Sequence, residues 1–148
     1  MFLGEFLMDI EERLRAFEEV CRQEGLKITH QRLEVFRELL ISHDHPNVEK
    51  LYRRLLRKLP TISLDTVYRT LTTLEQHGLI TRVQTQESQA RFEGRIDSHH
   101  HVICKKCGKI TDFQWELLEA AVLPDEIVKW GIIEQKSITL HGLCQECG

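Results

Sequence analysis

Two Cys-x-x-Cys pairs constrain the folding of this chain more than any other feature of its sequence. Cys104 and Cys107 form the first pair, and Cys144 and Cys147 form the second. Four thiolates in two such turns are the usual ligands of a closed structural zinc site. Because 36 residues separate the two pairs, the chain between them must fold back to bring the thiols together. The pairs therefore predict a small unit that is held together by zinc.

Two other interpretations of the cysteine pairs are a set of disulfides and a thioredoxin-like redox centre. Disulfides do not fit the reducing cytoplasm that this cysteine usage indicates. A redox centre would need a strand-to-helix context, which the sequence around the pairs lacks. The fifth cysteine, Cys21, falls on the apolar side of a predicted helix, where we expect a small buried hydrophobe.

The length of the chain, 148 residues, allows one domain or two small ones. No apolar run approaches the ~20 residues that a membrane-spanning helix needs. The segment Met1–Met8 contains Glu5 and lacks a basic leader, so we do not expect a signal peptide. The use of the cysteines favours a reducing cytoplasm over an oxidising compartment.

The first part of the chain has the pattern of four helices followed by a β-hairpin. Apolar residues at helical spacing follow four candidate capping residues: Asp9, Thr29, Asn47 and Ser63. The four predicted helices end near Gly25, Ile41, Pro60 and Gly78. Segments 79–85 and 90–93, joined by a polar turn, predict the hairpin. This order is that of a winged helix-turn-helix domain.

The fourth predicted helix would be the DNA-reading helix of such a domain. Its exposed face carries Tyr68, Arg69, Thr72 and Thr73, whose side chains suit base edges and phosphates. A helical core with a polar, solvated outer face is the alternative interpretation of this pattern.

Basic residues are concentrated around this helix, although the whole chain has a net charge of −3. Residues 50–82 contain seven basic and only two acidic side chains. Such asymmetry is typical of a surface that faces phosphates, whereas a solvated helix face would explain the charges equally well. We expect Arg53, Arg57 and Lys58 to displace counterions from DNA.

The second part of the chain begins after an expected hinge, so the predicted domains are residues 1–93 and 99–148, with residues 94–98 between them. The pattern predicts two strands, Val102–Cys104 and Ile110–Phe113, two helices, Trp115–Val122 and Asp125–Trp130, and a last strand, Ile132–Leu140. A unit of about fifty residues seldom has a sufficient core, so a metal and a partner subunit are both expected. The predicted fold class is α+β, with a small α/β second domain.

Three consecutive histidines, His99–His101, indicate a second metal site. On a strand, His99 and His101 point to one face and His100 points to the other. With Glu93 and Asp112 they would form an imidazole and carboxylate set that suits iron, manganese or zinc. If His45 joins this set, the metal connects the two domains; a lone histidine is more commonly a cap or a surface residue.

The chain resembles the ferric uptake regulator (Fur) family of metal-dependent transcriptional repressors. Matching segments follow one another in order along nearly the whole chain: residues 25–32, 45–46, 63–71, 91–93, 99–109 and 142–147. The resemblance implies a winged-helix DNA-binding domain, a C-terminal α/β dimerisation domain, and a homodimer that binds a palindromic operator when it is loaded with metal.

By position, the resemblance also implies roles for individual residues. It assigns structural zinc to the four paired cysteines and regulatory iron or manganese to His45, Glu93, His99, His101 and Asp112. It places operator contacts at Tyr68 and Arg69, and we expect Lys27 and Arg32 in the first matching segment to contact DNA as well. A further site of some members would use Ser98, His100, Glu119 and Lys136. Because serine and lysine stand where the family usually has histidine, we do not expect that site.

Two branches of the family fit the residues. Asp112 resembles the peroxide-sensing branch (PerR), which we take as the primary interpretation, whereas Glu93 and Arg69 resemble the iron-uptake branch. The zinc-sensing branch typically places a cysteine in the sensing site, and no cysteine is available for that position.

Two functions outside the family fit the residues less well. A zinc hydrolase would need a motif such as His-Glu-x-x-His, which the sequence lacks, so we do not expect an enzyme. A zinc-stapled protein-interaction domain would leave the basic helices and the histidine and carboxylate set without a role.

Overall fold

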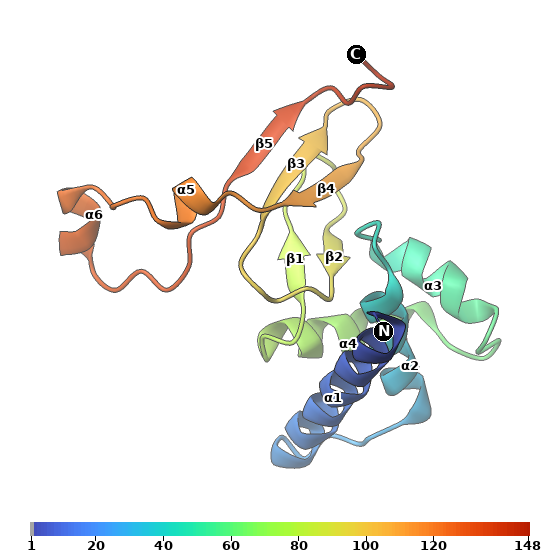
Figure 1. Cartoon of the computed structure of the whole chain (residues 1–148). Helices are drawn as coiled ribbons and strands as arrows, with labels where there is room; N and C mark the ends of the chain where they lie inside the picture. The colour runs from blue at the N-terminus through green and yellow to red at the C-terminus, as the bar shows by residue number, and fades with distance from the viewer. Residues whose placement is uncertain (1) are drawn as a thin grey trace. The chain divides into compact units, whose positions relative to one another are not determined.

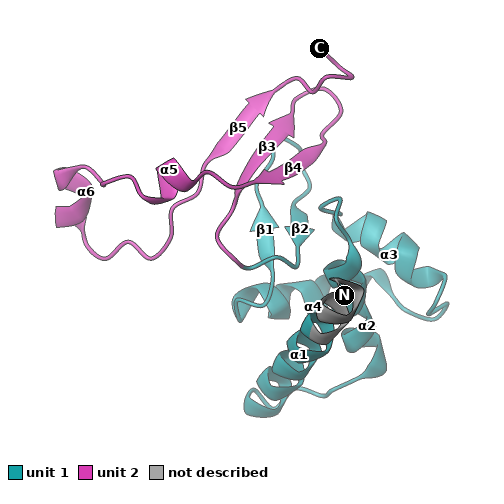
Figure 2. Cartoon of the chain, in the orientation of Figure 1, with its two compact units in different colours: residues 1–96 teal, residues 97–148 magenta. Residues whose placement is uncertain are grey.

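The structure, a computed structural model, describes residues 2–148, with side chains from Asp9 onward. The expectation about a signal peptide in residues 1–8 therefore lies outside the described side chains. The chain divides into two compact units, residues 1–96 and 97–148, which Figure 2 distinguishes by colour. Within the part of the chain that the structure describes, no helix has both the length and the apolar character of a membrane span.

The first unit consists of four helices and a two-stranded antiparallel sheet. Its elements are α1 (Phe2–Gln23), α2 (His30–Ile41), α3 (Val48–Leu56), α4 (Leu64–Gln76), β1 (Thr81–Val83) and β2 (Arg91–Glu93), as Figure 1 shows. Strands β1 and β2 pair with Arg82 opposite Phe92. This element order is the predicted winged helix-turn-helix.

Side-chain caps begin three of the helices at the predicted residues. The side-chain oxygens of Thr29, Asn47 and Ser63 accept hydrogen bonds from the backbone amides three positions later, at 3.2, 2.8 and 3.1 Å. Gly25 and Gly78 have φ values of +67° and +69°, the left-handed conformation that ends a helix at little cost for glycine.

Two predicted helix bounds are wrong. Helix α1 begins at Phe2 and not at Asp9. A residue that can cap a helix can also lie inside one, and no proline precedes Asp9 to stop the helix from extending toward the N-terminus. Helix α3 ends at Leu56, before the predicted end near Pro60. Pro60 disfavours helical geometry at Leu59, and the amides of Lys58 and Leu59 both donate to the carbonyl of Leu55 in a tight turn.

The helices of the first unit enclose an apolar core. Phe17 of α1 and Phe36 of α2 meet edge to face, with ring centroids 5.7 Å apart. The predicted burial of Cys21 is confirmed, since only 2% of this residue is exposed. Burial raises the pKa of its thiol. The guanidinium of Arg13 on α1 donates to the carbonyls of Leu79 and Gly94 and so fixes both ends of the hairpin to the helices.

The second unit contains a three-stranded sheet and two short helices. Its elements are β3 (His100–Cys104), β4 (Ile110–Phe113), α5 (Glu116–Glu119), α6 (Asp125–Trp130) and β5 (Thr139–Gly142). The strand order is β4-β3-β5, with β3 antiparallel to β4 and parallel to β5. The predicted α+β class is confirmed by this combination of helices and small sheets.

The bounds of three elements in the second unit also differ from the prediction. Strand β3 begins at His100, where Val102 was expected. Helix α5 has four residues where Trp115–Val122 was expected. The last strand was expected at Ile132–Leu140, but only residues 139–142 pair, with β3. The apolar pattern that suggested the longer elements includes Val122 and Ile132, which are 94% and 88% exposed in the single chain. The pattern therefore marks an apolar surface in these segments.

Candidate functional site

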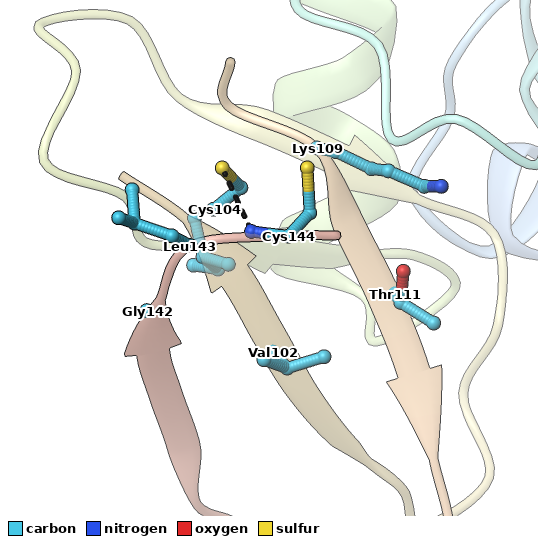
Figure 3. Close-up of a pocket in the computed structure, with 8 residues that line it drawn as sticks. Val102, Cys104, Lys109, Thr111, Gly142, Leu143 and Cys144 are labelled. Carbon is cyan, nitrogen blue, oxygen red and sulfur yellow. Dashed lines mark hydrogen bonds between the residues drawn. The ribbon is translucent and has the colours of Figure 1, made fainter. Parts of the chain in front are cut away.

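The four paired cysteines meet at one end of the sheet in the second unit. Their sulfur atoms all lie within 4.8 Å of one another. The parallel pairing of β3 with β5 places Cys104 opposite Gly142 and brings Cys144 beside the first pair. The amide of Cys144 donates to the sulfur of Cys104 at 3.4 Å, the dashed line in Figure 3. Gly108, at φ +78°, allows the tight turn after Cys107.

The thiols of this cluster differ strongly in acidity. Backbone amides of Cys107 and Cys144 lower the pKa of Cys104 to about 6. Hydrogen bonding to the side chain of Cys144 raises the pKa of Cys147 to about 12. The sulfurs of Cys107 and Cys144 are 3.9 Å apart, too far for a disulfide. Four free thiols gathered within this distance form the donor set of a tetrahedral zinc site.

A cavity of about 150 Å³ adjoins the cysteine cluster. Figure 3 shows Val102, Lys109, Thr111 and Leu143 along its walls. This volume is smaller than that of a typical small-molecule pocket. The cavity is therefore part of the surroundings of the cysteine cluster and does not indicate a separate ligand site.

A second cluster in this unit joins two imidazoles with a carboxylate. The Nε2 atoms of His99 and His101 lie 3.1 Å apart. Asp112, which stands opposite His101 in the β3–β4 pairing, places Oδ1 at 3.3 Å from His101 Nε2 and at 3.9 Å from His99 Nε2. His99 is only 5% exposed. These nitrogen and oxygen atoms converge as metal ligands from neighbouring strands would.

His100 points away from this cluster, as strand alternation requires. It is fully buried, and its ring packs against Phe113 with centroids 5.4 Å apart. Its Nδ1 accepts a hydrogen bond from the amide of Ile138, and its Nε2 lies 3.7 Å from Glu119. This environment gives His100 a packing role in the second unit.

A pair of buried polar residues lies in the first unit. Nε2 of His45, in the loop before α3, is 2.9 Å from a carboxylate oxygen of Glu93 at the end of β2, and both side chains are 5% exposed. His45 has φ +52°, a left-handed conformation that costs a residue other than glycine about 1–2 kcal/mol. The fold maintains this conformation, and the donor atoms suit iron, manganese or zinc.

Two residues beside this pair were missed by sequence reasoning. The carboxylate of Asp44 accepts hydrogen bonds from Arg54 and lies 2.9 Å from Lys50, both on α3. The hydrogen bond from Arg54 holds the pKa of Asp44 well below its usual range. The side chain of Arg91 donates to the carbonyls of Asp44 and His45. A sequence signal existed for Arg91, because the Arg91-Phe92-Glu93 segment belongs to the family pattern.

The predicted reading helix presents an accessible face. Tyr68 is 54% exposed, and the side chain of Arg69 is 78% exposed and pairs with Asp65 at 2.9 Å. The hydroxyls of Thr72 and Thr73 donate to carbonyls one turn earlier in the same helix, at 3.0 and 3.1 Å. The aromatic ring and the guanidinium are therefore the more accessible groups of this face.

The other predicted DNA-contacting residues differ in how strongly they are engaged. Arg53 is 75% exposed in its side chain, and Arg57 is also exposed. Lys58 pairs with Glu38 at 3.1 Å, which offsets part of its charge. Arg32, in the first turn of α2, donates to the carbonyl of Lys27, which precedes that helix.

This chain is similar to known proteins over most of its length. The model of the Ferric uptake regulator family matches residues 23–141. The peroxide-responsive repressor PerR of Staphylococcus epidermidis is 32% identical over 142 residues, which cover 95% of this chain and 94% of that protein. The PerR of Staphylococcus aureus strain USA300 is 33% identical over 139 residues, 93% of each chain.

Solved structures agree with the family match. The Helicobacter pylori ferric uptake regulator Fur has a TM-score of 0.82 at 30% identity over 93% of each chain. The Campylobacter jejuni peroxide stress regulator has a TM-score of 0.67 at 28% identity, over 90% of this chain and 98% of its own. With a family match over most of its length and relatives above 30% identity, the chain belongs to the ferric uptake regulator family.

Proposed function

We propose that this protein is a homodimeric, metal-dependent transcriptional repressor that senses peroxide through regulatory iron and resides in the cytoplasm. The observation that carries the proposal is the presence of two groups of buried or half-buried metal-ligand atoms, one in each unit. His45 and Glu93 form the group in the first unit. His99, His101 and Asp112 form the group in the second. The role is that of a regulator and not of an enzyme.

The regulatory ion would be held by ligands from both groups. Neither group has enough donors for a complete iron or manganese site, because these ions take up to six ligands and favour imidazole and carboxylate. Ligands that come from two units would make the arrangement of the units depend on the metal. When bound there, iron supplies the redox chemistry with peroxide, whereas manganese holds the same ligands without that reaction.

The four cysteines would hold a structural zinc ion with a separate role. Their sulfur atoms are gathered within 4.8 Å, and a thiol pKa of about 6 at Cys104 favours the thiolate form that zinc requires. Zinc binding would then contribute to the folding free energy of the small second unit.

A second copy of the chain is the proposed partner of the second unit. Four large apolar residues there are more than three-quarters exposed in the single chain: Leu117, Val122, Trp130 and Ile132. Exposed apolar groups at this density mark a surface that a partner subunit covers. A two-fold symmetric dimer would present two α4 helices to the half-sites of a palindromic operator.

On the DNA side, Tyr68 and Arg69 of α4 would contact the operator. Arg69 can make a bidentate contact with guanine once its pair with Asp65 opens. Arg53 of α3 and Arg57 directly after it, with Lys58, Lys27 and Arg32, would contact phosphates and position the helix. Thr72 and Thr73 complete the proposed reading face.

Peroxide sensing is preferred because it is supported by the relatives and by one ligand. The curated relatives at 32–33% identity are named peroxide-responsive repressors. Asp112 is the ligand of the proposed site whose residue type resembles the peroxide-sensing branch of the family. An iron-responsive regulator is the second candidate, supported by Glu93 and by the similarity to the Helicobacter pylori Fur.

The test uses full-length protein purified without oxygen and loaded with zinc and ferrous iron. Brief treatment with dilute peroxide is expected to add one oxygen atom to His45 or His99, seen by peptide mass spectrometry, and to release operator DNA. The manganese-loaded protein is the control and should remain unmodified and bound. Unmodified histidines with full operator binding would instead support the iron-responsive candidate.

A further inference from the structure

We propose that Arg91 is the residue that positions His45 for metal binding, and that Asp44 ties this loop to the DNA-contacting helix α3. This inference rests on the proposed function, in which His45 and Glu93 are regulatory ligands. It concerns residues of the first unit alone, and none of the residues that it adds is itself a proposed ligand.

Strand β2 contacts the backbone carbonyls of the loop that contains His45. Nε of Arg91 donates to the carbonyl of His45, and Nη2 donates to the carbonyl of Asp44 at 2.8 Å. The amide of Phe92 donates to the carbonyl of Pro46 at 3.0 Å. Three consecutive carbonyls of the loop therefore meet two consecutive residues of the strand. Glu93 is the next residue of this strand, so the same contacts fix the separation of the two ligands.

The conformation of His45 explains why the loop needs these contacts. Its φ of +52° lies in a region that residues with a side chain adopt seldom and only when their surroundings enforce it. The side chain of Arg91 is 13% exposed. A planar guanidinium can donate to two neighbouring carbonyls at once, whereas a lysine ammonium is a point charge on a flexible chain. Arginine at this position therefore fits the geometry in a way that lysine cannot reproduce.

Asp44 connects the same loop to α3. Its carboxylate accepts a hydrogen bond from Nη1 of Arg54 at 3.0 Å and contacts Nζ of Lys50 at 2.9 Å. Arg54 also donates to the hydroxyl of Ser42 at 3.0 Å, at the end of α2. The residue directly before a proposed ligand is therefore fixed to the helix that carries Arg53. Movement of His45 on metal binding would be transmitted to α3 through this contact.

The first experiment measures manganese binding to the zinc-loaded, full-length protein by calorimetry. Arg91→Ala and Arg91→Lys are both expected to weaken manganese binding 10- to 100-fold, the range found when residues that orient a ligand are removed. The zinc content should stay at the wild-type value. If one variant fails to fold, the other still tests the inference.

Arg82→Ala is the matched control for a loss of stability. Arg82 lies on the neighbouring strand β1, forms a paired hydrogen bond with Glu75 on α4, and stacks over Phe92 at 5.1 Å. Its removal should destabilise the hairpin and leave manganese affinity within about twofold of wild type. An equal loss of affinity in Arg82→Ala and Arg91→Ala would overturn the positioning role, because general loosening of the hairpin would then explain both.

The second experiment tests the link to α3 with Asp44→Asn. Operator affinity without manganese should stay within about twofold of wild type, since Asp44 is not a proposed DNA contact. The factor by which manganese strengthens operator binding should fall at least fivefold, because the coupling between the two sites is interrupted. An unchanged factor would overturn the link.

His45→Ala separates failure of this inference from failure of the proposed function. If His45→Ala loses manganese binding and Arg91→Ala retains wild-type affinity, the inference is wrong and the proposed site stands. If the wild-type protein binds no manganese beyond its zinc site, the proposed function fails and the inference fails with it. Weakened binding in both Arg91 variants, beside near-normal binding in Arg82→Ala, supports the inference.

Discussion

Nε2 of His45 lies 2.9 Å from a carboxylate oxygen of Glu93, although the two residues are 48 positions apart in the sequence. Each side chain is 5% exposed. A buried carboxylate is costly unless a positive charge or several hydrogen bonds compensate for it. The pair therefore has the chemistry of a site that a divalent cation would stabilise.

Replacement of Glu93 should separate metal binding from stability. Glu93→Gln is expected to weaken manganese binding by at least about tenfold, because the amide cannot supply the negative charge of the ligand. The free energy of unfolding of the manganese-free protein should change by no more than about 1 kcal/mol, since the variant also removes a buried charge. Calorimetry and urea denaturation measure the two effects. Glu12→Gln, on the exposed face of α1, is the control and should change neither.

Loss of one cysteine should remove the structural zinc. Cys104→Ser is expected to abolish stoichiometric zinc binding and to unfold the second unit or separate the dimer, because the metal contributes part of the folding free energy. Metal analysis, near-ultraviolet circular dichroism and analytical ultracentrifugation would report these changes. Cys21→Ser, which alters the buried cysteine of the first unit, should keep its zinc. A zinc-free Cys104→Ser dimer with the wild-type Tm would rule out this assignment.

The exposed guanidinium of Arg69 is expected to read bases. Arg69→Ala should lose about 1–3 kcal/mol of binding free energy for the cognate operator and much less for random DNA. Arg53→Ala is the contrasting variant, which should weaken binding to both DNAs similarly. It should also reduce the slope of log affinity against log salt concentration by about the amount expected for one phosphate contact. Fluorescence anisotropy at several salt concentrations measures both. Equal losses on both DNAs for Arg69→Ala would make it a phosphate contact.

Gly94, directly after Glu93, is expected to tolerate no side chain. A Cβ atom there would lie 2.9 Å from Cδ2 and 3.3 Å from Cα of Leu40 on α2, so the hairpin end would have to move. Gly94→Ala should destabilise the first unit by about 1–3 kcal/mol, the usual cost of overpacking, and should also weaken manganese binding. Gly142→Ala is the control, because no atom lies within 4 Å of its added Cβ. Equal Tm values for the two variants would show that the hairpin end adapts freely.

Local features of the sequence predicted much of the fold. The caps at Thr29, Asn47 and Ser63 were predicted correctly, because a residue with a side-chain oxygen acceptor that precedes apolar residues at helical spacing commonly caps a helix. The start of α1 was not found, because Asp9 has the chemistry of a cap and yet lies within a longer helix. The extent of β5 was not found either, because apolar residues such as Ile132 are exposed in the single chain.

The candidate site was predictable only in part, for a related reason. The residue types and their spacing indicated the cysteines and the His99–His101 run as candidate ligands, because closely spaced cysteines and histidines have few roles other than metal binding. The family pattern includes Arg91, but the role of this residue was not predicted, because its partners are backbone carbonyls and the sequence does not show which carbonyls a side chain will meet. The left-handed backbone of His45 was not predicted either, because histidine adopts that conformation more often than most residues but still only in a small minority of cases.

The central claim is that metal at the two ligand groups controls DNA binding, and one linkage measurement tests it most directly. Operator affinity is measured with and without manganese, and manganese affinity is measured with and without operator, for zinc-loaded wild type and His45→Ala. The account predicts that each ligand strengthens the other by the same factor in the wild type, as linkage requires, and that both factors fall to about one in His45→Ala. Operator binding that is equally tight with and without manganese in the wild type would contradict it.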